Sequence, residues 1–157
     1  MRVGFGYDSH RFADGRRLVL GGVEFPGERG LAGHSDADVL IHAIIDALLG
    51  AAALGNIGSH FPDTDETWRD ADSTKLLEAV RDELSSAGYA IGNIDATVIC
   101  ERPKIGPRVD EIRRRLGELL ALPVEAISVK GKTNEKLDDV GAGLGIAVHA
   151  VCLLEAK

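Results

Sequence analysis

Strand-like and helix-like segments alternate along this chain, and the alternation constrains its fold more than any other sequence feature. Residues 2–12 have the period-2 pattern of a strand, whereas residues 36–49 read as an apolar-periodic helix with an acidic first turn. Two short strands flank Gly21-Gly22 in a predicted hairpin. Further strands and helices are predicted from Asp72-Ser73 onward and at 94–100, 109–120, 127–130 and 146–154. We therefore expect an α/β fold, an α+β sandwich in which one layer of helices covers a mixed sheet.

The length of 157 residues fits one domain, so we expect a single domain over residues 1–157. No apolar run approaches the roughly 20 residues that span a membrane. The chain also lacks the pattern of a signal peptide, so we expect a cytoplasmic protein without a membrane partner. Cys100 and Cys152 lie in apolar strand-like runs without CxxC spacing, which predicts buried, reduced thiols.

The charge of the chain argues against nucleic acid as a partner. The net charge is −7 and the pI is near 5.2, whereas nucleic-acid binders usually present a basic face. The three arginines at 113–115 lie on a predicted helix with a buried stripe at Ile112, Leu116, Leu119 and Leu120, so we expect them on its solvated face. Any recognition of phosphate must then be local.

Asp8, His10 and His42 form a candidate metal site. A strand points residues 8 and 10 to the same face, and one face of the following helix would bring His42 to them. One carboxylate and two imidazoles suit a catalytic divalent metal with an open coordination position. The alternative is that Asp8 and His10 only end a strand while His42 is a core histidine. Asp46, one turn beyond His42, could orient that ring, although a capping or solvated aspartate is an equal alternative.

Four polar loops, at 33–38, 55–65, 101–104 and 132–136, together have the composition of a phosphate-ester site. Ser35 or Asp36 could cap the helix that carries His42, and the free N–H groups of its first turn would suit an anionic oxygen. His34 could donate a hydrogen bond to phosphate. Simple capping is the alternative for Ser35 and Asp36, and the two roles can coexist.

Several motifs occur in one register along the chain. They are Gly-Tyr-Asp-Ser-His at 6–10, Gly-His-Ser-Asp-Ala-Asp at 33–38, His42, and Ile-Gly-Ser-His-Phe-Pro-Asp-Thr-Asp at 57–65. On these motifs the chain resembles the 2-C-methyl-D-erythritol 2,4-cyclodiphosphate synthase family. The resemblance continues almost to the end of the chain through Asp72-Ser73, 92–95, Pro103-Lys104, Lys130 and 133–137.

The resemblance implies an enzyme of the non-mevalonate route to isoprenoid precursors. In that family, 4-diphosphocytidyl-2-C-methyl-D-erythritol 2-phosphate cyclises to 2-C-methyl-D-erythritol 2,4-cyclodiphosphate and releases CMP. The substrate's own 2-phosphate attacks the β-phosphorus, so the enzyme needs no nucleophile and has to fold the substrate and stabilise developing charge. The resemblance also implies a ferredoxin-like sheet and a homotrimer whose active sites lie between subunits.

The resemblance assigns roles to individual residues. The three candidate ligands Asp8, His10 and His42 would hold Zn²⁺ or another divalent transition metal, and Glu135 would hold Mg²⁺ or Mn²⁺. His34 and Thr133 would stabilise the transition state. From the residues alone, Thr133 and Asn134 could instead form a simple turn after the strand that ends at Lys130.

The remaining assigned residues would contact the substrate. Residues 61–65 would hold the erythritol part, with Asp63 as the hydroxyl partner, and residues 100–106 would form the cytidine pocket. The expected substrate contacts are Ser35, Asp36, Asn56, Ile57, Gly58, Phe61, Pro62, Asp63, Thr64, Asp65, Cys100, Pro103, Lys104, Lys132 and Asn134.

The chain departs from the family pattern at several positions. Asn56 stands where an aspartate is usual, which keeps hydrogen bonding but removes a charge. Ala142 stands where some members have an arginine that binds a diphosphate in the trimer's central cavity, so we expect no such binding. Lys132 and Asp138-Asp139 also differ from the usual pattern. Because the metal set and Glu135 are complete, we expect an active enzyme.

Two other classes of function remain open from the residues alone. A metal-dependent phosphodiesterase could use the same ion to activate water and would leave linear products. A noncatalytic module that binds an isoprenoid diphosphate or a partner protein would use the metal structurally. The open coordination position and Glu135 argue against the noncatalytic module.

Overall fold

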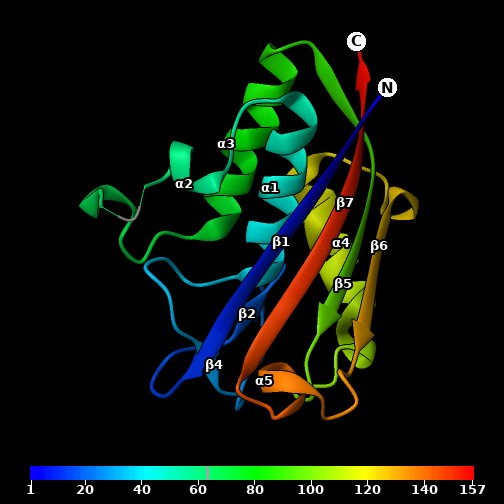
Figure 1. Ribbon diagram of the computed structural model, residues 1–157. Helices are drawn as coiled ribbons and strands as arrows, with labels where there is room; N and C mark the ends of the chain where they lie inside the picture. Colours follow the sequence, from blue (N-terminus) through cyan, green and yellow to red (C-terminus); the bar gives the residue numbers. More distant parts are fainter. Residues whose placement is uncertain (63) are drawn as a thin grey trace.

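Five strands form one mixed sheet in the computed structural model, which describes residues 1–62 and 64–157 (Figure 1). In spatial order they are β4 (Gly30–Leu31), β1 (Arg2–Ala13), β7 (Gly145–Ala156), β5 (Tyr89–Ile99) and β6 (Ile127–Lys132). A separate hairpin pairs β2 (Val19–Leu20) with β3 (Val23–Glu24). The helices are α1 (Val39–Ala52), α2 (Ile57–His60), α3 (Ser73–Ser86), α4 (Val109–Leu120) and α5 (Asp138–Gly141), with 3₁₀ turns at Glu66–Trp68, Gly106–Arg108 and Val124–Ala126.

The sheet combines antiparallel and parallel pairs. Strand β7 lies antiparallel between β1 and β5, whereas β5 and β6 are parallel and are connected through α4. The predicted α/β sandwich with a mixed sheet is therefore confirmed. Its core order is β-α-β-α-β-β, in which only the short helix α5 lies between the last two strands.

Two glycines let α1 lie directly on β1. A Cβ atom added at Gly4 would lie 1.8 Å from the carbonyl oxygen of Ala47, and one added at Gly6 would lie 1.9 Å from that of Ala43. No side chain fits in this space, so only glycine permits the approach. The strand that carries the first predicted metal ligands is therefore in backbone contact with the helix that carries the third.

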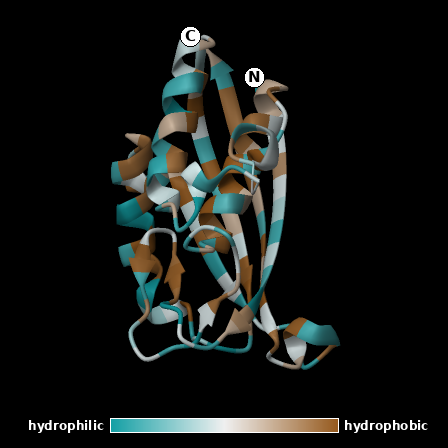
Figure 2. Cartoon of the chain, turned by 90° about the vertical axis from the view of Figure 1, so that its left-hand side faces the viewer, coloured by the Kyte–Doolittle hydropathy of each residue, from teal (hydrophilic) through white to brown (hydrophobic). Residues whose placement is uncertain are grey.

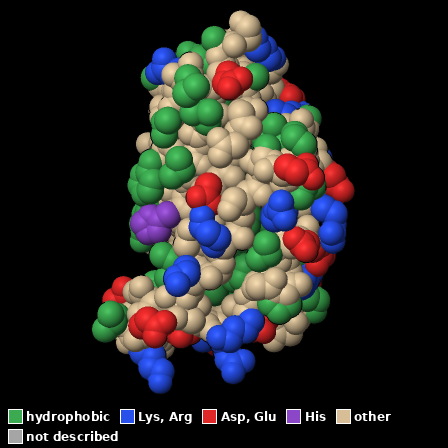
Figure 3. All heavy atoms as spheres, turned by 90° about the vertical axis from the view of Figure 1, so that its right-hand side faces the viewer, with side chains coloured by type: hydrophobic (Ala, Val, Ile, Leu, Met, Phe, Trp, Pro, Cys, Tyr) green, Lys and Arg blue, Asp and Glu red, His purple; other side chains and the backbone are tan. Residues whose placement is uncertain are grey.

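The helices cover one face of the sheet and leave part of the other face exposed. Figure 2 shows hydrophobic stretches along the strands and along the helices that pack on them, and α1 is buried along nearly its whole length. On the other side of β1, Val3, Phe5 and Tyr7 are exposed, and Val151 of β7 is exposed with them. Figure 3 shows hydrophobic side chains gathered along one edge of the molecule, with charged side chains scattered over the rest of that view.

The structure corrects three expectations about the elements. Helix α1 begins at Val39 and is capped by Asp38, so the acidic residues precede its first turn and the predicted capping by Ser35 or Asp36 is wrong. The left-handed backbone of Ala37, with φ of 58°, separates those two residues from the helix. Strand β5 begins at Tyr89 rather than at 94, because an irregularity between Ile91 and Asn93 interrupts its period-2 pattern. The loops after α1 and β6 contain the short helices α2 and α5.

The other predictions about the elements and cysteines are confirmed. The Gly21-Gly22 hairpin, the start of α3 after Asp72 and the buried stripe of α4 are all present. Cys100 and Cys152 are buried, free thiols. Within the two described ranges, no helix has the length and hydropathy needed to cross a membrane.

Candidate metal centre and substrate pocket

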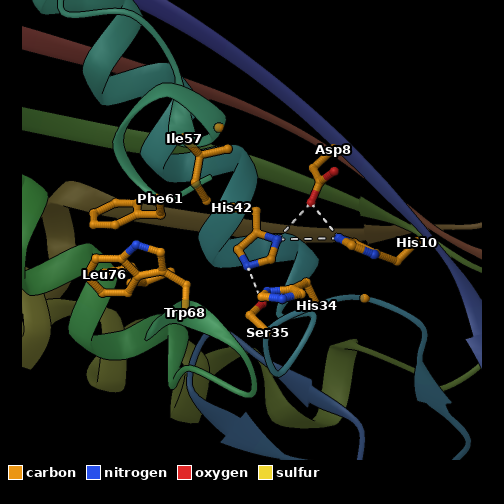
Figure 4. A pocket seen from close by; sticks show the side chains of 11 residues that line it. Asp8, His10, His34, Ser35, His42, Ile57, Phe61, Trp68 and Leu76 are labelled. Carbon is orange, nitrogen blue, oxygen red and sulfur yellow. Dashed lines mark hydrogen bonds and ion pairs between the residues drawn. The ribbon is translucent and has the colours of Figure 1, made fainter. Parts of the chain in front are cut away.

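The structure brings Asp8, His10 and His42 together as predicted (Figure 4). Oδ2 of Asp8 lies 3.0 Å from Nε2 of His10 and 3.1 Å from Nδ1 of His42, and these two ring nitrogens are 3.4 Å apart. One oxygen and two nitrogen ligands therefore converge on one point at the boundary of β1 and α1. This donor set fits a divalent transition metal.

The ring of His10 is oriented by the backbone. Its Nδ1 lies 2.6 Å from the carbonyl oxygen of Ala32, which has no proton to give, so Nδ1–H donates this hydrogen bond. Nε2 is then the nitrogen that faces Asp8 and His42. A histidine ligand held through its other nitrogen in this way is typical of metal sites.

The charges in this cluster support each other. Burial opposes ionisation of Asp8, but hydrogen bonds from His10 and His42 outweigh it and lower the pKa of Asp8 to about 2. Burial also opposes the charged form of His10, yet its hydrogen bond to Asp8 raises the pKa of His10 above the usual histidine value. Without a metal, the carboxylate is therefore ionised and attracts a positive charge to this point.

A pocket of about 240 Å³ opens next to the three ligands. His34 and Ser35 line it beside the metal ligands, and Ile57, Gly58 and Phe61 line its other side, so five predicted substrate or catalytic residues are brought to the ligands (Figure 4). Gly33, Trp68 and Leu76 also line the pocket and were missed in the sequence. The ring of Trp68 packs edge to face on that of Phe61, with 4.9 Å between the ring centroids. Trp68 is the single tryptophan of the chain, and this was the sequence signal that could have pointed to it.

The other described residues that were predicted in the 55–65 loop do not line this pocket. The amide oxygen of Asn56 accepts a hydrogen bond from the backbone N–H of Ser59 and caps α2. Asp65 caps the turn Glu66–Trp68. Pro62 and Thr64 belong to the same loop outside the pocket lining, and the Asp63 prediction lies outside the described residues.

Two aspartates near the site bind backbone rather than the pocket. Asp36 accepts hydrogen bonds from the backbone N–H of Ser73, from its hydroxyl, and from the backbone N–H of Asp38. Asp46 accepts a 2.7 Å hydrogen bond from the backbone N–H of Ile57, so it holds the start of α2 rather than the ring of His42. Of the two interpretations of Asp46, the structure favours the capping aspartate.

The remaining predicted residues gather around a second pocket of about 180 Å³. Its lining comprises Cys100, Pro103, Lys104, Ile105, Gly106, Gly131, Lys132 and Thr133, and it shares no residue with the pocket beside the metal ligands. Beyond Thr133, Glu135 accepts a 2.8 Å hydrogen bond from the Thr133 hydroxyl, and the backbone N–H of Asn134 donates to Glu101. One chain therefore presents the candidate site as two separate groups of residues.

Comparison with known proteins places this geometry in a family. The chain matches the YgbB family over residues 1–155. It is 56% identical over 156 residues to the 2-C-methyl-D-erythritol 2,4-cyclodiphosphate synthase of Salinibacter ruber, covering 99% of each chain.

Two solved structures are also similar. A 2C-methyl-D-erythritol-2,4-cyclodiphosphate synthase in a CDP-bound form aligns with a TM-score of 0.90 at 38% identity, covering 98% of this chain and 100% of that one. The bifunctional IspDF of Campylobacter jejuni aligns with a TM-score of 0.96 at 38% identity, covering 99% of this chain, which spans only 42% of that one. The resemblance carried by the sequence motifs is thus confirmed, and the chain belongs to the YgbB family.

Proposed function

We propose that this chain is a cyclodiphosphate synthase that converts 4-diphosphocytidyl-2-C-methyl-D-erythritol 2-phosphate to 2-C-methyl-D-erythritol 2,4-cyclodiphosphate and CMP. The observation that carries the proposal is the convergence of Asp8, His10 and His42 on one point in the wall of a pocket lined by His34 and Ser35. The family match and the names of the relatives support the same reaction. The reaction is an intramolecular phosphoryl transfer, so the site needs positioning and charge stabilisation rather than a protein nucleophile.

The residues around the pocket have complementary roles in this proposal. Asp8, His10 and His42 would hold Zn²⁺ or another divalent transition metal, which when bound supplies a Lewis acid for a phosphate oxygen. His34 and Ser35 lie beside the ligands and offer hydrogen bonds to the phosphate. Phe61, Trp68 and Leu76 form an apolar wall that excludes water from the reacting groups.

The second pocket would receive the cytidine end of the substrate. Lys104 and Lys132 supply positive charge there, and Thr133 and Glu135 are hydrogen-bonded at its edge. Glu135 would hold Mg²⁺ or Mn²⁺ together with substrate phosphates, because Mg²⁺ commonly binds one or two carboxylates plus phosphates. Asn134, Asn56 and residues 61–65 would complete the contacts to the substrate.

We further propose that each complete site forms between copies of the chain in a homotrimer. Within one chain the two pockets share no lining residue, so a neighbouring copy can supply the second group. The exposed Val3, Phe5 and Tyr7 give the uncovered sheet face an apolar surface that suits contact with another copy. We place this activity on one domain, residues 1–157, and in the cytoplasm, where buried free thiols such as Cys100 stay reduced.

Phosphorus NMR of purified protein with Zn²⁺, Mg²⁺ and the diphosphocytidyl substrate tests the reaction. We expect one CMP per cyclic diphosphate formed, and we expect Asp8→Asn to abolish turnover. Asp110→Asn makes the same chemical change on the exposed side of α4 and should leave turnover unchanged. A linear diphosphate product would instead indicate a phosphodiesterase, and turnover by Asp8→Asn would contradict the assigned metal role.

A further inference from the structure

We propose that Ser73, held by Asp36, is a positioning residue that keeps the proton of His42 on Nε2, so that Nδ1 offers its lone pair to the metal. The inference rests on the metal site of the proposed function and adds to it a residue from α3. It also explains why the 33–38 loop and the start of α3 meet behind the metal ligands. Ser73 donates its backbone N–H to Asp36 at 3.0 Å, across 37 positions of sequence.

The two ring nitrogens of His42 have different surroundings. Nδ1 faces the other ligands, 3.1 Å from Oδ2 of Asp8. Nε2 faces away from them and lies 2.9 Å from Oγ of Ser73. His42 is 9% exposed and Ser73 is 0% exposed, so water does not replace these contacts. In a neutral imidazole one nitrogen carries the proton and the other accepts, so the partner of Nε2 decides what Nδ1 can do.

The hydrogen bonds of Ser73 determine the direction of this contact. Its hydroxyl donates to Oδ1 of Asp36, a carboxylate that also accepts the backbone N–H groups of Ser73 and Asp38. A hydroxyl has one proton, and this one is committed to Asp36. The Ser73 oxygen can therefore only accept from His42, so Nε2 must be the protonated nitrogen.

Ser35 offers the other hydroxyl near this nitrogen, at 3.2 Å from Nε2 of His42 (Figure 4). Its oxygen accepts the backbone N–H of Ala37, and its own proton is not committed to a carboxylate. If Ser35 donated to a bare Nε2, two lone pairs would face each other 2.9 Å apart at the Ser73 contact. The protonated Nε2 is compatible with both serines, and it leaves the Ser35 proton for a phosphate oxygen.

Nitrogen-15 NMR of the unmodified protein, labelled in its histidine rings, tests the tautomer directly. In protein loaded with Zn²⁺, we expect His42 with a proton on Nε2 and none on Nδ1. After loading with ¹¹³Cd²⁺, we expect coupling of cadmium to Nδ1 of His42. A proton on Nδ1, or cadmium coupling to Nε2, would overturn the proposal.

A pair of serine variants tests the role of Ser73. Ser73→Ala should weaken Zn²⁺ binding about 10- to 100-fold, the usual cost of removing a group that orients a metal ligand. It should also shift the Nε2–H resonance of Zn²⁺-loaded His42, because that proton loses its acceptor. Ser86→Ala removes a hydroxyl from the far end of the same helix, where it donates to the backbone of Asp82, and should change neither property. An unchanged Nε2–H resonance and unchanged Zn²⁺ affinity in Ser73→Ala would refute the proposal. If Ser73→Ala does not fold, the histidine NMR of the unmodified protein still tests the proposal. Neither measurement requires turnover, so a failure of the proposed cyclisation reaction would be distinguished from a failure of this inference.

Discussion

Replacing Gly6 with alanine should separate the two elements that share the metal ligands. The new Cβ would lie 1.9 Å from the carbonyl oxygen of Ala43 and 2.6 Å from the backbone nitrogen of Ala47. Both atoms belong to the backbone of α1, so no side-chain rotation can relieve the contact. Restoring a separation of 3.0 Å requires α1 to move from β1 by about 1 Å.

The size of the effect follows from this displacement. Overpacking costs roughly 1–3 kcal/mol, and a contact between two backbones belongs near the upper value. For a chain of this length, about 3 kcal/mol lowers Tm by roughly 6–12 °C. The same movement lengthens the 3.1 Å distance between Asp8 and His42, so we expect Zn²⁺ affinity to fall at least about tenfold, because metal ligands tolerate misplacement of only about 0.5 Å.

Thermal unfolding and zinc calorimetry, at one protein concentration, measure both effects. Gly50→Ala is the matched control because Gly50 is exposed in the same helix and an added Cβ finds its nearest atom at 4.0 Å. We expect this control to keep its Zn²⁺ affinity and to gain up to about 1 kcal/mol from the better helix propensity of alanine. A Gly6→Ala protein with the Tm and Zn²⁺ affinity of the unmodified chain would refute the reasoning.

Three further outcomes follow from the structure. The raised pKa of His10 favours its protonated form in metal-free protein, so Zn²⁺ must displace a proton and its affinity should fall as pH decreases through that pKa. Calorimetry in buffers of different ionisation enthalpy should detect this proton release, and no release near pH 6 would contradict the assignment of His10 as a ligand. Burial raises the pKa of Cys100 and Cys152 from 9.0 to about 11, which lowers the thiolate fraction near pH 8. A thiol reagent at that pH should therefore react about 100-fold faster with unfolded than with native protein, and equal rates would show that the thiols are accessible. Phe5→Glu, on the uncovered sheet face, should dissociate the proposed trimer to the 16.7 kDa chain without loss of far-UV circular dichroism, and a native mass that stays three times larger would exclude this face as the interface.

The metal triad could be predicted from the sequence because its parts lie on regular elements. Alternation in β1 puts Asp8 and His10 on one face, and the apolar periodicity of α1 turns His42 toward the core. Only the β2–β3 hairpin and the two-residue strand β4 separate the two elements in the sequence, which favours a direct contact between them. These local patterns place the three side chains near one another, and the resemblance of the motifs to a known family favoured a metal site over the structural alternative.

The groups behind the ligands could not be predicted in the same way. Ser73 begins a helix and Asp36 lies in a turn, and both have the composition of ordinary capping residues. Their contact joins residues 37 positions apart and exists only once α3 packs beside α1. The pairing of β1 with β7, from Arg2 with Leu154 to Arg11 with Gly145, is likewise a non-local contact that no pattern within either strand specifies.

The position of α1 is determined at two independent places, and both bear on the metal site. Along its face, Gly4 and Gly6 set its distance from β1. At its start, the fully buried carboxylate of Asp38 accepts the backbone N–H groups of Gly21 at 2.9 Å and Gly22 at 2.7 Å, which joins the helix to the β2–β3 hairpin. A change at either place moves His42 relative to the ligands on β1, and so it alters the metal site together with stability. A change at Gly50, the exposed position of α1, should affect stability alone, so the two kinds of variant separate packing from metal binding.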